Sequence, residues 1–168
     1  MRKLLSATLT AGILATAAGT ANALTATTTF PVTATVLATC SVAAPALAFG
    51  NYTPGGGAVA GTTAIAVKCT NGTTFAVALS GGLGAGTITQ RLMTNGASTL
   101  QYNLYTNTTH TTLWGDGVTG GSVTQPGTGT GLATAVNYTV YGSLPDSAAN
   151  QASAPGAYTD TITVTVTY

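Results

Sequence analysis

The strongest constraint on the fold is a strict alternation of apolar residues and threonines at the end of the chain. In the run TITVTVTY, threonines occupy every second position. The positions between them hold Ile162, Val164, Val166 and Tyr168. Successive side chains of a β-strand point to opposite faces of its sheet. The alternation therefore predicts a strand with one apolar face and one threonine face.

A second alternating stretch, TATTTFPVTATVLAT, occupies residues 25–39. Pro31 interrupts it, and proline is disfavoured inside a central strand because it lacks a backbone donor. A strand with an apolar stripe must be buried, either in its own domain or in a neighbouring subunit. The stripe of this stretch consists of Phe30, Val32, Ala34 and Val36.

The first 23 residues have the organisation of a secretory signal peptide. Arg2 and Lys3 form a short basic region, an apolar stretch covers residues 4–18, and Ala21-Asn22-Ala23 resembles a cleavage site. The apolar stretch is too short and too rich in threonine and glycine to favour a membrane anchor. Cleavage after Ala23 would leave 145 of the 168 residues, enough for one domain with a core.

Short alternating segments separated by glycine-rich turns recur through the rest of the chain, with no amphipathic helix of useful length. Asn71-Gly72 is a strong type I′ turn signal, which predicts a hairpin between the segments on either side of it. Five to seven such strands in one domain indicate an antiparallel β-sandwich of immunoglobulin-like type. An eight-stranded barrel is the alternative. The segments centre on Val67, Val77, Tyr102 and Tyr138.

The chain is unusually poor in charge, with 4% charged residues. Beyond the signal peptide, two basic residues stand against three acidic ones, which gives a net charge of −1. The residues are Lys68, Arg91, Asp116, Asp146 and Asp160. This excludes a basic patch, so no nucleic-acid partner is expected. Near-neutral surfaces tend to associate, which suits a protein that polymerises.

Two cysteines follow the signal peptide, Cys40 and Cys69. An even count in an exported chain indicates one disulfide, closing a loop of about 30 residues and stabilising the fold by roughly 3–4 kcal/mol. A pair of buried free thiols is the alternative. Metal binding by the two is disfavoured because no histidine or third cysteine lies nearby in the sequence.

No catalytic, metal or cofactor site is predicted. Paired carboxylates, metal-ligand spacings and phosphate-binding loops are missing from the sequence. The single histidine, His110, follows a turn and is expected to be a solvated loop residue. Asp116 lies between glycines in Gly115-Asp116-Gly117 and is expected to bond its own backbone, with calcium ligation as the alternative.

Several pieces of the chain, in this order, resemble the spore coat protein U domain, the fold shared by subunits of archaic chaperone–usher pili. The resemblance covers nearly the whole mature chain. Its pieces are the strand before Cys40, the Cys40…Cys69 pair, LQYNLY at 100–105, LWGDG at 113–117, YTVYGSLP at 138–145, and GAYTDT at 156–161 leading into the last strand.

The resemblance implies an incomplete immunoglobulin-like sandwich that lacks its last strand. A periplasmic chaperone would lend a strand, and at an outer-membrane usher the next subunit's N-terminal segment would replace it. Residues 24–39 lie where the family keeps this donor segment, which leaves 40–168 as the pilin domain. The donor side chains would be Phe30, Val32, Ala34 and Val36.

The implied function is that of a structural, non-enzymatic subunit of a secreted surface fibre that supports adhesion and biofilm. One domain with a donor-like segment favours a shaft or adaptor subunit over a tip adhesin. Two alternatives remain, a non-pilus secreted or spore-coat protein with the same domain, and a self-contained secreted binding domain or enzyme.

Overall fold

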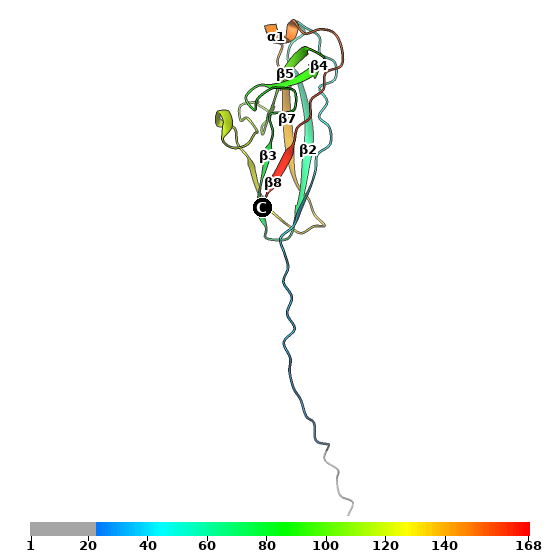
Figure 1. Ribbon diagram of the computed structural model, residues 1–168, viewed down its shortest axis with the longest axis vertical. Coiled ribbons are helices and arrows are strands. Elements are labelled where there is room, and N and C mark those ends of the chain that lie inside the picture. The colour runs from blue at the N-terminus through cyan, green and yellow to red at the C-terminus, as the bar shows by residue number, and fades with distance from the viewer. Residues whose placement is uncertain (1–22) are drawn as a thin grey trace, which may run out of the picture. The chain divides into compact units, whose positions relative to one another are not determined.

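The computed structural model describes residues 23–168, so the predicted signal peptide, residues 1–23, lies outside the described residues except for Ala23. The chain divides into two units, of which the first ends at Thr35 and the second spans Val36–Tyr168. In the first unit, residues 23–35 form neither helix nor strand and are exposed. All named strands belong to the second unit (Figure 1).

The second unit contains a five-stranded antiparallel sheet. Its centre is a long pairing between β2 and β7, which runs from Val59 opposite Leu144 to Val67 opposite Val136. The strands follow the order β1-β2-β7-β5-β4 across the sheet. Their bounds are Cys40–Ala43 (β1), Val59–Cys69 (β2), Arg91–Asn95 (β4), Ser98–Tyr105 (β5) and Val136–Leu144 (β7).

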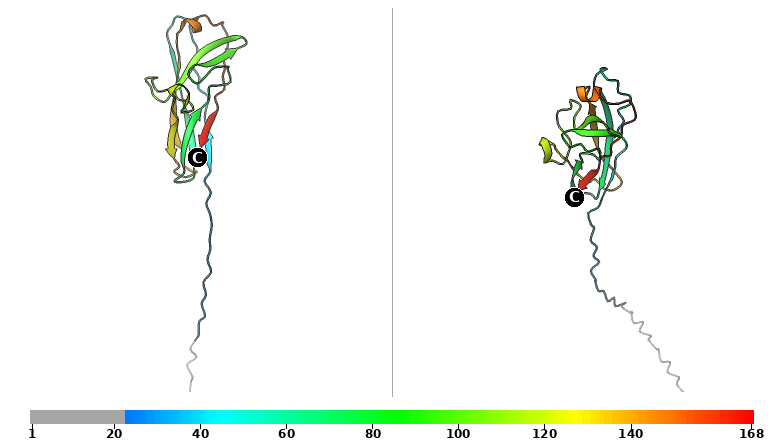
Figure 2. Two further views of the ribbon diagram at one scale, coloured as in Figure 1. Left: turned by 60° about the vertical axis from the view of Figure 1, so that its left-hand side comes forward. Right: turned by 45° about the horizontal axis from the view of Figure 1, so that its top comes forward.

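A three-stranded antiparallel sheet packs against the first, and the two share one core (Figure 1). Its order is β6-β3-β8, with bounds Gln125–Thr128 (β6), Thr74–Leu79 (β3) and Val164–Thr167 (β8). The helical pieces are one turn each, η1 at Thr119–Gly121 and α1 at Ala148–Gln151. The arrangement is the predicted immunoglobulin-like sandwich rather than a closed barrel (Figure 2).

The core forms because the side chains that point inward from each strand are mostly apolar, as the alternation predicts. Buried side chains from both sheets make one cluster, with Trp114 fully buried at its centre. The Trp114 indole nitrogen donates to the Val77 carbonyl at 3.0 Å, so its only polar atom is satisfied inside the core. In β8, Val164 and Val166 pack against this cluster while the threonines face solvent.

The predicted hairpin at Asn71-Gly72 is wrong. β2 pairs with β1 and β7, whereas β3 pairs with β6 and β8, so the turn carries the chain from one sheet to the other. The Thr73 amide donates to the Thr70 carbonyl at 3.0 Å, and Gly72 has φ of 79°. Asn71 keeps a negative φ, whereas a type I′ turn needs positive φ at both central residues.

Arg91 is fully buried at the start of β4. Its guanidinium donates to three backbone carbonyls and one amide oxygen, with no carboxylate in contact. The acceptors are Ser80 O at 2.9 Å, Trp114 O at 2.8 Å, Ile88 O at 3.4 Å and Asn103 Oδ1 at 3.1 Å. Burial lowers the pKa of the Arg91 guanidinium, and the nearby Tyr102 and Asp160 oppose that shift. Arg91 thus ties β4 and β5 to two loops.

Candidate functional site

The last strand of the sandwich has an unpaired edge. β8 pairs with β3, and the order β6-β3-β8 leaves its other side without a partner strand among residues 23–168. Just before β8, the Thr163 carbonyl accepts from the Ser80 amide at 3.0 Å, and the Thr163 amide donates to Ser80 Oγ at 2.9 Å. Because backbone groups alternate along a strand, the N–H and C=O groups of Val164 and Val166 point to the open side.

On the other sheet, the segment of residues 44–49 follows β1 and forms no strand. Pro45 has no backbone donor, and its carbonyl accepts from Thr63 Oγ1 at 3.0 Å. No backbone–backbone hydrogen bond outside the strands involves residues 44–49. Apart from Pro45, the backbone donors and acceptors of this segment therefore have no backbone partner of this kind.

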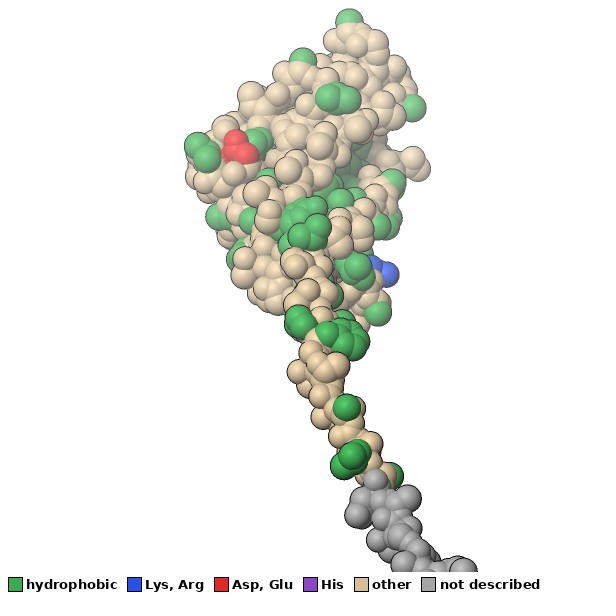
Figure 3. Space-filling view, turned by 60° about the horizontal axis from the view of Figure 1, so that its bottom comes forward, with side chains coloured by type: hydrophobic (Ala, Val, Ile, Leu, Met, Phe, Trp, Pro, Cys, Tyr) green, Lys and Arg blue, Asp and Glu red, His purple; other side chains and the backbone are tan. Residues whose placement is uncertain are grey.

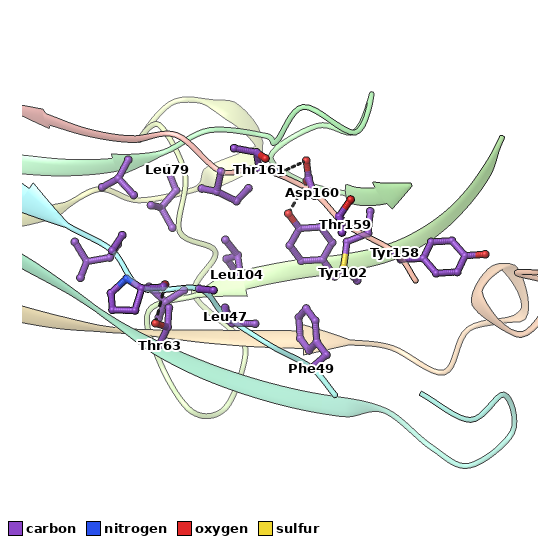
Figure 4. Close-up of a pocket in the computed structure, with 18 residues that line it drawn as sticks. Leu47, Phe49, Thr63, Leu79, Tyr102, Leu104, Tyr158, Thr159, Asp160 and Thr161 are labelled. Carbon is purple, nitrogen blue, oxygen red and sulfur yellow. Dashed lines mark hydrogen bonds between the residues drawn. The ribbon is translucent and has the colours of Figure 1, made fainter. Parts of the chain in front are cut away.

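A groove of about 370 Å³ lies between this segment and the residues that lead into β8. Hydrophobic side chains are gathered in a hollow on the face of the sandwich shown in Figure 3. Figure 4 shows Leu47, Leu79 and Leu104 pointing into the space between the strands. The other apolar side chains that line the groove include Ile65, Val140, Ile162 and Val164.

One end of the groove is aromatic and ends in a polar cluster. Phe49 and Tyr102 meet edge to face, with ring centroids 5.9 Å apart, and Tyr158 lies nearby (Figure 4). Tyr102 donates its hydroxyl to Asp160 Oδ2 at 2.6 Å. Burial, and then the hydrogen bond to Asp160, raise the pKa of the Tyr102 phenol well above its ordinary value. Tyr102 therefore stays neutral and serves as a donor.

Asp160 also holds a loop in place. Its Oδ1 accepts from the amides of Leu83 at 2.8 Å, Gly84 at 3.0 Å and Thr161 at 2.7 Å. Asp160 also lies within 3 Å of the position that a Cβ on Gly82 would occupy, and Gly82 has φ of 91°. The residues before β8 are thus fixed in an irregular path that leaves the groove open.

The predicted donor side chains lie in residues whose backbone forms no strand. Phe30 is 80% exposed and Val32 is 85% exposed. Ala34 is exposed as well, and Val36, at the start of the second unit, is 82% exposed. An apolar stripe of this kind in water is a surface that a strand partner would cover. Its burial in another subunit stays a prediction.

The predicted disulfide is present. Cys40 and Cys69 stand directly opposite each other in the pairing of β1 and β2, with an S–S distance of 2.02 Å and Cα atoms 4.1 Å apart. Cys69 is fully buried in the core cluster, and Cys40 packs against that cluster. The bond joins the first strand of the domain to the centre of the five-stranded sheet, immediately before the free segment 44–49.

His110 and Asp116 are the two residues that the sequence analysis weighed as catalytic or calcium-binding. Both contact residues that are close to them in the sequence. His110 has φ of 53° in a loop, and its ring lies 5.2 Å from that of Tyr105. Asp116 Oδ1 accepts from the Val118 amide at 2.9 Å and the Thr119 amide at 2.7 Å, as the turn pattern predicts. The hydrogen bond from the Thr119 hydroxyl, and then those from the two amides, lower the pKa of Asp116.

Among residues 23–168 there is no group of three histidine, cysteine or acidic side chains that could hold a metal ion. In the same part of the chain, no helix is long and apolar enough to cross a membrane.

Sequence reasoning missed the two walls of the groove. The segment 44–49 is visible in the sequence only as a short apolar piece, and Tyr102 and Asp160 only as a strand residue and a charge. Their contact joins residues 58 positions apart, which no local pattern reports. The one available signal is the irregular spacing of apolar residues before β8, where alternation begins only at Ile162.

An immunoglobulin-like sandwich in which the free edge of β8 borders an apolar groove belongs to the class of β-domains that have room for one more strand. A model of the Spore Coat Protein U domain matches residues 26–165, and the chain belongs to this family. The match begins within the predicted donor segment and ends inside β8.

The chain is also similar to one chain of a solved structure, the CsuC-CsuE chaperone-tip adhesion subunit pre-assembly complex from archaic chaperone-usher Csu pili of Acinetobacter baumannii. The identity is 25% and the TM-score is 0.53. The similarity covers 80% of this chain but 40% of that chain, so this protein corresponds to less than half of its length. A search of curated protein sequences found no match.

Proposed function

We propose that this protein is a structural subunit of a secreted surface fibre of the archaic chaperone–usher type, polymerising by donor-strand exchange. The observation that carries the proposal is the groove between residues 44–49 and β8, which combines apolar walls with free backbone groups. The chain also carries, at residues 24–39, a segment whose alternation matches such a groove.

The energetics favour insertion of a strand between the two walls. An added strand forms ladder hydrogen bonds with an open edge, and its alternate side chains fill pockets. Full burial of a Phe or Val side chain contributes roughly 1.5–3 kcal/mol, so Phe30 and Val32 would supply much of the driving force. Ala34 is smaller and needs a shallower pocket. Pro31 must lie where no ladder donor is required.

The partners follow from this assembly route. Residues 1–23 would direct export and be removed, residues 24–39 would be the donor, and residues 40–168 would be the accepting domain. An unpaired apolar edge aggregates, so a periplasmic chaperone would cover the groove before an outer-membrane usher delivers the next subunit. Identical or related subunits then occupy the groove in a fibre outside the cell, where it would support adhesion and biofilm. The role is structural rather than enzymatic.

The family name favours one alternative, a non-pilus coat protein with the same domain. The similarity to a chaperone–usher pilus complex supports the pilus instead. If genes for a chaperone and an usher lie beside the gene for this protein, the pilus function is favoured. If they are missing there, the coat-protein function is favoured.

Truncation of the donor segment tests the proposal. Removal of residues 24–36 is expected to stop polymerisation while leaving a domain that a chaperone still holds, because only the donor is lost. The measurement is fibre formation in electron micrographs, together with chaperone co-purification from periplasm. Fibres assembled from the truncated protein would overturn the proposal.

Two single substitutions, one on each face of the donor segment, make the test more specific. Val32→Asp is expected to reduce fibre formation nearly as much as the truncation, because an unpaired carboxylate would enter an apolar groove. Thr33→Ser is the matched control on the opposite face and is expected to leave assembly unchanged. Equal effects of the two substitutions would show that the parity of the segment does not matter, against donor-strand insertion.

A further inference from the structure

A second concave site lies on the outer face of the five-stranded sheet. It has a volume of about 160 Å³ and is built from β5, β7 and the loop before β4. We call it the polar pocket. The side chains used below are Thr89, Gln90, Gln101, Asn103, Tyr105 and Ser143. We propose that the polar pocket binds one ring of an uncharged sugar.

The polar pocket opens on the outer face of the five-stranded sheet and the groove on its inner face, and Tyr102 contributes to the lining of both. Along β5, Leu100, Tyr102 and Leu104 are buried, so the residues between them point outward. Asn103 stands opposite Ser143 on β7, and side chains of paired residues share a face. A strand in the groove would therefore leave the polar pocket open.

The floor of the polar pocket is held rigidly from behind. Asn103 Oδ1 accepts from the Arg91 guanidinium at 3.1 Å, and Asn103 Nδ2 donates to the Thr89 carbonyl at 2.6 Å. These bonds fix the orientation of the amide. They leave one N–H and one lone pair of the side chain free to face a ligand. Such a pre-organised polar group costs little ordering when a ligand binds.

The chemistry of the lining selects the ligand class. Amides and hydroxyls offer both donors and acceptors, and a sugar hydroxyl acts as both. The Gln90 side chain and the Ser143 hydroxyl make no hydrogen bond in the described residues, so both remain available. Tyr105 adds an aromatic ring for the apolar face of a sugar, next to Tyr141, which stands opposite it on β7.

No ionised side chain lines the polar pocket. Arg91 lies behind Asn103, but it is fully buried, oxygens engage four of its five N–H donors, and the Asp160 carboxylate is near enough to affect its pKa. A charged ligand would lose hydration there without gaining an accessible counter-charge. A neutral sugar ring loses less hydration free energy on entering the polar pocket. Repeated copies of the pocket along a fibre would raise the avidity of a site that is weak by itself.

The test uses the purified full-length exported protein and methyl glycosides of glucose, galactose, mannose and N-acetylglucosamine as probes. Saturation-transfer NMR and titration calorimetry are expected to detect at least one of them, with Kd on the order of 1 mM. Sialic acid and inorganic phosphate are the charged comparisons. The proposal is overturned if no neutral glycoside binds the folded protein, or if a charged probe binds more tightly.

Variants locate the site. Tyr105→Ala is expected to weaken binding at least about tenfold through loss of the ring, and Gln90→Ala about fivefold through loss of one hydrogen bond. Thr139→Ala, on the outer face of β7 but outside the polar pocket, is the control and is expected to leave Kd unchanged. Gln90 is exposed, so its variant remains informative if Tyr105→Ala fails to fold. Binding that survives both substitutions would overturn the proposal.

Discussion

Arg91 carries the only charge in the described chain that is fully buried, and it is neutralised by dipoles rather than by a salt bridge. Its planar guanidinium reaches Ser80, Asn103 and Trp114 at once, from a strand that lies at the edge of the sheet. A fork of donors with fixed geometry suits such a site, and a lysine cannot reproduce it.

Arg91→Leu is expected to lower the free energy of unfolding by about 3 kcal/mol or more, because several buried oxygens would lose their donor at about 1–3 kcal/mol each. Arg91→Lys keeps the charge but reaches fewer acceptors, so it should also destabilise the domain, by less. Urea unfolding followed by Trp114 fluorescence measures both. Wild-type stability of Arg91→Leu would show that the hydrogen bonds of the buried guanidinium do not stabilise the fold.

The hydrogen-bonded pair of Asp146 and Tyr52 is expected to make the stability of the fold depend on pH. Asp146 accepts from the Tyr52 hydroxyl and from the amides of Gly55 at 3.1 Å and Gly57 at 3.0 Å. The bond from Tyr52, and then those from the amides, lower the pKa of Asp146 from 3.8 to about 2. Desolvation and Asp146 raise the pKa of Tyr52 from 10.0 to about 12.

The sign of each shift fixes the direction of the pH dependence. A depressed carboxyl pKa contributes stability above pH 3.8 that is lost as the pH falls towards 2, and a raised phenol pKa contributes stability below pH 10 that is lost as the pH rises towards 12. Asp146→Asn should therefore lower Tm at pH 7 and show a smaller further fall between pH 4 and 2. A wild-type acid profile in this variant would show that the pair does not contribute.

At the scale of elements, the first strand depends on its disulfide. β1 is four residues long and lies at the edge of its sheet, with β2 as its only paired neighbour among the described strands. A strand this short contributes few ladder bonds, so the Cys40–Cys69 bond is a main factor that holds it in place. The same bond positions residues 44–49, the first wall of the groove.

Cys40→Ser combined with Cys69→Ser is expected to lower the free energy of unfolding by roughly 3–4 kcal/mol, since the bond closes a loop with a sequence separation of 29. Denaturation of the oxidised and double-mutant proteins measures the difference. The mass of the exported protein, two hydrogens below the thiol form, confirms the oxidised state. Two free thiols in periplasmic material would contradict the disulfide.

At the scale of the whole molecule, the proposed function predicts that a strand covering the open edge of β8 stabilises the sandwich. A synthetic peptide of residues 24–39, added to the full-length monomer at 100 times its Kd, should raise the free energy of unfolding by about 2.7 kcal/mol. The same peptide with Val32→Asp should have no effect. A stabilisation that is equal for both peptides would point to non-specific association. This difference is measurable by thermal denaturation.

The fold is expected to need no metal ion. The carboxylate oxygens of Asp116 already accept local donors, and no cluster of ligating side chains occurs among residues 23–168. Treatment with EDTA should leave Tm unchanged. A fall of several degrees that is reversed by calcium would establish a calcium site at Asp116.

Alternation did not predict β4 or β6, and the alternating stretch at residues 25–39 forms no strand. The sequence by itself determined the segments that form β2, β3, β5, β7 and β8, their buried faces and the residues of the disulfide. These follow from local rules, because the period of two in a strand and the preference of a turn act over a few residues. The alternation at Val164 and Val166 therefore predicts the inward face of β8 correctly. The resemblance carried by the motifs adds the family.

Only the tertiary structure decided which strands share a sheet. Asn71-Gly72 predicts a turn, but whether that turn closes a hairpin or crosses between sheets depends on the partners of β2 and β3, which lie far away in the sequence. The groove has the same origin. Its walls at residues 44–49 and 158–164 are separated by more than 100 positions, and they face each other only because the two sheets pack together with no strand paired between them.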